Sequence, residues 1–187
     1  MKKILLLCVL CLIFGCASQQ PTFYQLVTTS EPEVTYPQFK QTVLVRSVVL
    51  PGETSRPQIT TVGGNDYELN IDEFNRWGAE PNKMIQRIIA QDLQLHLPKA
   101  IIELQSALRK NYDYDVSVEI NEFSGKLGDN AKLSASYFIK NPQGKVIKSG
   151  RIQETVAIED GYGNYVLAQS RLLGALSIQI ADDLTSL

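Results

Sequence analysis

From residue 113 onwards the sequence alternates between polar and apolar residues, and this alternation constrains the fold more than any other feature. A period of two is typical of a β-strand with one face buried and the other in water. The first such segment covers 113–121 and the second covers 132–140. A turn sequence, Asn-Pro-Gln-Gly at 141–144, then leads into a third strand over 145–158. The pattern predicts an antiparallel meander. The core-facing positions are expected to be Tyr114, Val116, Val118 and Ile120, then Leu133, Ala135, Tyr137 and Ile139.

Shorter strands are expected earlier in the chain. Residues 23–27 suit a first strand, and residues 43–49 are so rich in β-branched side chains that we expect a strand buried on both faces, in the centre of the sheet. Residues 59–62 and 67–69 flank a Gly-Gly-Asn-Asp sequence, which is typical of a β-hairpin. Residues 100–104 are compatible with either a strand or a helical turn.

Two helices are predicted from apolar residues at helical spacing. The first begins at Pro81, where the missing N–H of proline is harmless, and is stopped by Pro98. Its apolar face is expected to contain Ile85, Ile88, Ile89, Leu93 and Leu97, with Lys83, Arg87, Gln91 and Gln94 facing outward. The last helix carries the stripe Leu173, Leu176, Ile180 and Leu184. The fold class predicted is α/β (α+β), as a single domain in which helices pack on a mixed β-sheet.

The N-terminus is typical of an exported protein. Lys2 and Lys3 precede an apolar run at 4–14 that is too short to span a bilayer. The run ends in Ile-Phe-Gly-Cys, which resembles a bacterial lipobox, so we expect cleavage after residue 15 and acylation of Cys16; an ordinary secretory signal is the alternative. Several acyl chains would hold the protein firmly in a membrane. Ala17 follows, without the Asp of an inner-membrane retention signal, which favours the periplasmic leaflet of the outer membrane.

The predicted organisation is therefore a signal peptide over 1–15, a lipidated tether over 16–22 and one periplasmic domain over 23–187. The mature domain has no free cysteine, because two of the three cysteines leave with the signal and the third is acylated. Loss of the two signal-peptide lysines lowers the formal net charge from −2 to −4. With no basic block, nucleic-acid binding is disfavoured.

The sequence offers little catalytic chemistry. His96 is the only histidine, and no Gly-x-Ser-x-Gly motif accompanies it. Carboxylate pairs occur at Asp72-Glu73, at Asp113 and Asp115, and at Asp182-Asp183; alternation places the second pair on a wet strand face and the third lies at a frayed terminus, so solvated charges are expected. We predict no catalytic residue, no metal site and no cofactor, and a non-enzymatic protein.

A family resemblance is carried by three stretches in the first half of the chain. They are Val-Val-Leu-Pro at 48–51, Ser-Arg-Pro-Gln-Ile-Thr at 55–60, and Phe-Asn-Arg-Trp-Gly-Ala-Glu-Pro at 74–81. With Phe-Tyr-Gln-Leu at 23–26 and the terminal helix, they resemble the PqiC-type lipoproteins, which are auxiliary components of ABC-type transporters associated with MCE-domain systems. The chain departs from the family at 51–54, where many members have an aromatic residue and a leucine.

The resemblance implies a fold similar to the N-terminal domain of TolB. It also implies a subunit of an assembly that moves lipids between the two membranes and supports envelope integrity. The expected partners are an MCE-domain protein and copies of the chain itself in a ring. Partner contact is assigned to Arg56, Pro57, Trp77 and Glu80, although a turn, a core position and a helix start are the simpler explanations of these residues.

Two rival functions remain open from the sequence. One is an assembly lipoprotein for an outer-membrane barrel or a secretin, and the more distant one is a periplasmic hydrolase. A deep pocket holding His96 or clustered carboxylates would favour the hydrolase. An apolar cavity large enough for a lipid would favour direct lipid carriage, whereas a solid core would favour a scaffold.

Overall fold

The computed structural model describes residues 19–29, 34–65, 67–105 and 111–187. The predicted signal peptide and Cys16 lie outside the described residues. A five-stranded sheet has the order β5-β2-β6-β7-β8. Its strands are β2 (Thr42–Val45), β5 (Ile101–Leu104), β6 (Tyr114–Lys126), β7 (Asn130–Lys140) and β8 (Val146–Ala157). Strands β6, β7 and β8 form the predicted antiparallel meander, and β2 pairs in parallel with both β5 and β6.

The alternation in the meander is confirmed. Val116, Val118 and Ile120 of β6 are buried, as are the four predicted core positions of β7. The turn between β7 and β8 is also confirmed, because the Gly144 N–H donates to the Asn141 carbonyl at 2.9 Å. The segment at 100–104, for which the sequence allowed a strand or a helical turn, contains the edge strand β5.

The prediction that 43–49 forms the central strand is only partly right. Strand β2 is internal and buried, but it ends at Val45, and β6 is the middle strand of the sheet. The difference follows from length: β6 is 13 residues long, so it pairs with the short β2 at one edge and still pairs along its whole length with β7 at the other.

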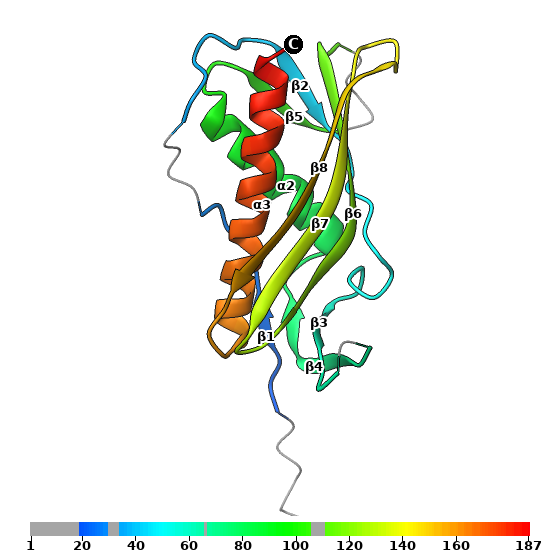
Figure 1. Ribbon diagram of the computed structural model, residues 1–187, viewed down its shortest axis with the longest axis vertical. Coiled ribbons are helices and arrows are strands. Elements are labelled where there is room, and N and C mark those ends of the chain that lie inside the picture. Colours follow the sequence, from blue (N-terminus) through cyan, green and yellow to red (C-terminus); the bar gives the residue numbers. More distant parts are fainter. Residues whose placement is uncertain (1–18, 30–33, 66, 106–110) are drawn as a thin grey trace, which may run out of the picture.

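A second, three-stranded sheet was not predicted. Its order is β1-β4-β3, with β1 (Thr22–Tyr24) parallel to β4 (Leu69–Trp77) and β3 (Gln58–Val62) antiparallel to β4. The predicted β3–β4 hairpin is confirmed, but β4 extends far beyond Leu69. Strands β1, β3 and β4 lie together at one end of the molecule (Figure 1).

Strand β4 bulges between its two ends. Gln58 pairs with Arg76 and Thr60 pairs with Ile71, so β4 carries extra residues in between. The Asp72 carboxylate stabilises this bulge by accepting bonds from the backbone N–H groups of residues 74 and 75, both at 2.7 Å, and from the Tyr162 hydroxyl at 2.8 Å. Burial alone would raise the pKa of Asp72, but these donated bonds outweigh it and lower the pKa below its usual 3.8.

Helices α2 (Pro81–His96) and α3 (Tyr162–Thr185) pack on each other, and α3 lies along β7 and β8 (Figure 1). Both predicted apolar faces are buried. No helix in the described part of the chain is long and apolar enough to cross a membrane. The result is a mixed α+β single domain, which confirms the predicted fold class, with two sheets in place of one.

Candidate functional site

Three of the four predicted partner-binding residues surround one groove of about 400 Å³. The groove lies where β4 ends and α2 begins. We call it the Trp77 groove; its walls are Ser55, Pro57, Trp77, Ala79, Glu80, Pro81 and Asn82. Two segments about 20 residues apart in sequence therefore meet at one surface feature.

Backbone hydrogen bonds on both sides of β4 hold the Trp77 groove together. The Trp77 N–H donates to the Pro57 carbonyl at 2.7 Å, and the Gly78 N–H donates to the Tyr24 carbonyl at 2.8 Å. The loop that carries Pro57, the end of β4 and the end of β1 are thus fixed relative to one another. The groove is consequently built on rigid strands and a helix start, which suits a binding surface.

Trp77 belongs mainly to the hydrophobic core. Its side chain is only 6% exposed and packs in the cluster formed by both helices and the main sheet, with one part reaching the groove. Of the two interpretations open from the sequence, core packing therefore describes most of its surface. Pro57, Ala79 and Glu80 are exposed, and these residues offer the accessible wall of the groove.

Arg56 and Glu80 have different local roles. Arg56 is half-buried, its Nε has no hydrogen-bond partner among the described residues, and it does not line the groove. Glu80 precedes α2 without capping it through its side chain, and forms an exposed ion pair with Lys83 at 2.9 Å. The structure thus brings Pro57, Trp77 and Glu80 together and leaves Arg56 beside them.

The Trp77 groove is suited to binding rather than to chemistry. Glu80 is the only ionisable residue in its walls, so the groove has no acid–base pair. Across the described residues, no group of three or more His, Cys, Asp or Glu side chains is placed to hold a metal ion. The proline, tryptophan and alanine side chains of the Trp77 groove instead provide an apolar surface edged by polar groups, as in protein interfaces.

His96 is buried at the end of α2, near an Asp and a Ser, two residue types that also occur in catalytic triads. Its Nδ1 lies 2.8 Å from the Val34 carbonyl, and Asp92, one turn earlier on α2, lies 3.5 Å from the Ser177 hydroxyl of α3. All three side chains are buried, so a substrate cannot reach them in this conformation. Burial raises the pKa of Asp92 to about 6, against the opposing influence of His96 and Ser177.

The prediction that the carboxylate at Asp115 is solvated is wrong. Asp115 is only 2% exposed and forms an ion pair with Arg46, which follows β2. The alternation places Asp115 on the polar face of β6, but the Arg46 guanidinium covers it there and compensates the buried charge.

The prediction of a frayed C-terminus is wrong, because α3 runs to Thr185; Asp182 is exposed as expected, but both carboxylates have partners. Asp182 accepts a hydrogen bond from Tyr36 at 2.5 Å, and Asp183 accepts one from the buried Tyr137 at 2.6 Å. Lys148 of β8 also pairs with Asp183, at 3.3 Å. These contacts dock the last turns of α3 and raise the pKa of Tyr137, first through burial and then through the adjacent carboxylate.

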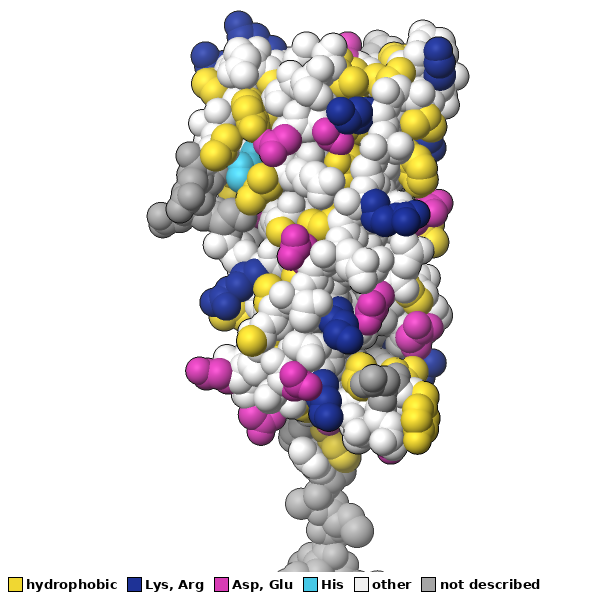
Figure 2. Space-filling view, in the orientation of Figure 1, with side chains coloured by type: hydrophobic (Ala, Val, Ile, Leu, Met, Phe, Trp, Pro, Cys, Tyr) yellow, Lys and Arg dark blue, Asp and Glu magenta, His cyan; other side chains and the backbone are white. Residues whose placement is uncertain are grey.

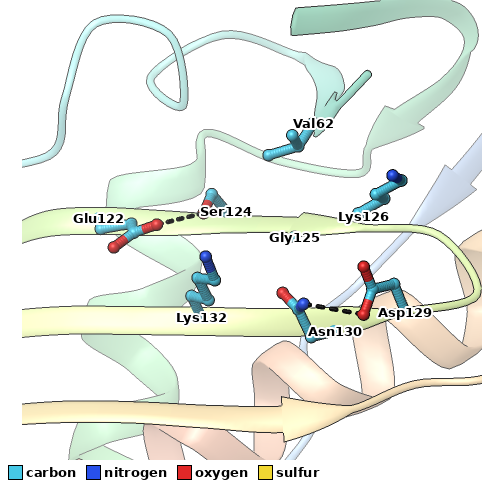
Figure 3. Close-up of a pocket in the computed structure, with 8 residues that line it drawn as sticks. All are labelled: Val62, Glu122, Ser124, Gly125, Lys126, Asp129, Asn130 and Lys132. Atoms are coloured by element: carbon cyan, nitrogen blue, oxygen red, sulfur yellow. Dashed lines mark hydrogen bonds between the residues drawn. The ribbon is translucent and has the colours of Figure 1, made fainter. Parts of the chain in front are cut away.

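A polar hollow of about 180 Å³ lies between Val62 at the end of β3 and the β6–β7 hairpin (Figure 3). Two cations, Lys126 and Lys132, face it together with two anions, Glu122 and Asp129. The anions accept hydrogen bonds from neighbouring Ser and Asn side chains. Because the charges balance, the hollow has no strong preference for an anion or a cation.

Comparisons with solved structures support the fold. The chain is similar to an uncharacterized protein of known crystal structure, with a TM-score of 0.73 and 17% identity over 88% of this chain and 99% of that chain. It is also similar to protein XCC0632 from Xanthomonas campestris, a DUF330 protein, with a TM-score of 0.70 and 14% identity over 86% and 92% of the two chains.

The search of curated proteins gave no match. The family model for the ABC-type transport auxiliary lipoprotein component matches residues 24–181, which include every strand and helix that lines the Trp77 groove. The chain therefore belongs to the family of ABC-type transport auxiliary lipoprotein components.

Proposed function

We propose that this protein is a non-enzymatic subunit of an MCE-type intermembrane lipid transport system, anchored by acylated Cys16 in the periplasmic leaflet of the outer membrane. Family membership supports a role as a lipoprotein in transport. The lipobox-like sequence at 13–16 and Ala17 support the anchor and its membrane.

The observation that carries the proposal is the Trp77 groove. The Arg-Pro and Trp-x-x-Glu-Pro sequences that resemble PqiC-type lipoproteins are about 20 residues apart along the chain, yet Pro57, Trp77 and Glu80 form one accessible groove. A groove with apolar walls and no reacting groups suits the docking of a protein partner. We assign the MCE-domain partner to this groove.

The described interior favours a scaffold over a lipid carrier. Buried residues from both helices and both sheets form one hydrophobic cluster. The Trp77 groove, the polar hollow and a hollow of about 170 Å³ near Thr60 all open to the surface, and the latter two are less than half as large as the groove. Lipid would therefore pass through the assembled partners.

In-cell crosslinking tests the partner. A photo-crosslinking residue at Pro57 or Asn82 reports on the groove, and one at Gln91, on the exposed side of α2, serves as the control. We expect the groove positions to capture an MCE-domain protein. Capture of copies of the chain would indicate a ring, and capture of only a barrel or a secretin would replace the proposal with an assembly role.

A matched pair of variants tests the groove itself. Ala79→Arg places a long charged side chain in the groove, whereas Gln91→Arg adds the same side chain to an exposed position elsewhere on α2. Both positions are exposed, so stability should change by no more than about 0.5 kcal/mol. We expect partner capture to fall about tenfold only for Ala79→Arg. Equal capture by both variants would exclude the groove as the contact.

Membrane fractionation tests the anchor separately. Cys16→Ser should leave the protein uncleaved or unacylated and remove it from the outer-membrane fraction. Unchanged fractionation of this variant would contradict acylation at Cys16.

A further inference from the structure

The parallel pairing of β1 with β4 indicates which end of the domain is closest to the membrane. Thr22 at the start of β1 pairs with Asn75, whereas β4 already begins at Leu69. Because the strands are parallel, β4 extends past the start of β1 in the direction from which the chain enters. The β3–β4 hairpin therefore projects toward the side of the predicted lipid anchor (Figure 1).

The tether is too short to hold this end far from a bilayer. Cys16 and Thr22 are six residues apart, so a fully extended chain spans at most about 20 Å between them. Leu69 also lies six residues before Asn75, the partner of Thr22, so the hairpin extends toward the membrane over part of the length of the tether; the bulge shortens this extension. With Cys16 acylated, the hairpin lies close to the lipid headgroups.

This end of the domain exposes apolar side chains. Tyr67, beside the hairpin turn, is 88% exposed, and Leu69 and Ile71 of β4 are also exposed. Hydrophobic side chains show at the surface around the lower end of the molecule (Figure 2). Single exposed apolar residues need no explanation, but a group on one hairpin marks an interaction surface. Aromatic residues are common where a protein meets the boundary of a bilayer.

The charges around the hairpin indicate that its contact with a bilayer is apolar rather than electrostatic. Glu68 and Glu73 flank the exposed residues of the hairpin, and the nearby polar hollow has balanced charges. Electrostatic attraction to anionic lipids is therefore weak here. Contact would depend on burying the aromatic and aliphatic side chains, which salt does not screen.

We propose that the β3–β4 hairpin contacts the phospholipid bilayer in which the chain is anchored, with Tyr67 at the boundary between headgroups and acyl chains. This inference rests on acylation at Cys16, which is part of the proposed function. It goes further because it fixes the orientation of the domain. Trp77 lies at the opposite end of β4 from the hairpin, so the Trp77 groove is held away from the bilayer and toward a periplasmic partner.

Depth-dependent fluorescence quenching tests the contact. Two lipidated full-length variants, Tyr67→Trp and Val146→Trp, are purified from membranes and reconstituted into vesicles of phosphatidylethanolamine and phosphatidylglycerol that contain nitroxide-labelled lipids. Val146 is exposed and begins β8 at the other end of the meander, so it serves as the control. Trp77 is present in both variants, and the wild-type signal is subtracted.

We expect the tryptophan at position 67 to emit at shorter wavelength and to be quenched severalfold more than that at position 146, equally at low and high salt. Equal, weak quenching of both positions in protein that floats with the vesicles would overturn the bilayer contact and leave the anchor intact. Protection of position 67 only on addition of a partner protein would also overturn it. Failure of both variants to float would overturn the contact together with the anchor.

Discussion

Asp92 provides the sharpest test of the energetics of this fold. Its side chain is fully buried between α2 and α3, one carboxylate oxygen lies 3.5 Å from the Ser177 hydroxyl, and the other has no hydrogen-bond partner among the described residues. The perturbation is Asp92→Asn, which keeps the shape of the side chain and removes its charge. The variant is expected to be more stable than the wild type at neutral pH.

The magnitude follows from the proton affinity of the folded state. Burial raises the pKa of Asp92 from 3.8 to about 6, so the folded protein binds this proton more tightly than the unfolded chain. Each tenfold change in proton affinity corresponds to about 1.4 kcal/mol, which makes the ionised carboxylate cost about 3 kcal/mol above pH 6. The cost is absent below pH 3.8 and grows as the pH rises between these two values.

Urea denaturation across this pH range measures the effect. The chain from residue 17 onwards, wild type and Asp92→Asn, is compared with Asp129→Asn, which removes an exposed carboxylate. The free energies of unfolding of wild type and Asp92→Asn should be similar near pH 4 and differ by up to about 3 kcal/mol near pH 7.5. A difference that does not change with pH, or a less stable variant at pH 7.5, would refute the reasoning.

Three further variants and one control, Gly52→Ala, test packing and the bulge. A Cβ at Gly150 would lie 2.2 Å from the Tyr137 hydroxyl, so Gly150→Ala should lower the free energy of unfolding by about 1–3 kcal/mol, whereas Gly52→Ala, with open space around it, should change it by less than about 0.5 kcal/mol in the same urea titration. Trp77→Ala should cost about 3–5 kcal/mol, because the side chain is a core residue; a thermal unfolding midpoint close to that of the wild type would contradict this. Asp72→Ala should cost about 1–3 kcal/mol at neutral pH, and less as acid protonates the wild-type carboxylate; comparing urea midpoints at neutral and acidic pH checks both statements.

Local patterns predicted the parts of this fold that depend on neighbouring residues. The meander and both helices follow from a period of two and from apolar residues at helical spacing, and their buried faces match the predicted positions. The pairing of strands that are distant in the sequence could not be predicted from these local patterns. The parallel contact of β1 with β4 joins residues more than 50 positions apart, and no local signal marks it. For the same reason the strands divide into two sheets where one was predicted.

Some residues of the Trp77 groove were predicted, but from the resemblance to a family and not from hydrophobic periodicity or motif spacing. Pro57, Trp77 and Glu80 were chosen from family-like sequences, but only the structure shows that they line one groove, with the Trp77 N–H bonded to the Pro57 carbonyl. Ala79 was missed, because a lone alanine carries no signal in a sequence. The burial of Asp115 was missed because the charge that compensates it, on Arg46, comes from another strand.

The pairing of β1 with β4 also determines how the domain bears a mechanical load. A pull on the N-terminus acts along β1 and parallel to β4, so it shears the hydrogen bonds between these strands together and does not open them one by one. Immediately after β1 in the sequence, Leu26 is buried and the Val27 N–H donates to Ser170 of α3. These contacts attach the β1–β4 pair to the rest of the domain. If the proposed lipid anchor and periplasmic partner pull on the domain from opposite sides, the load acts along this line, in shear across the β1–β4 pair.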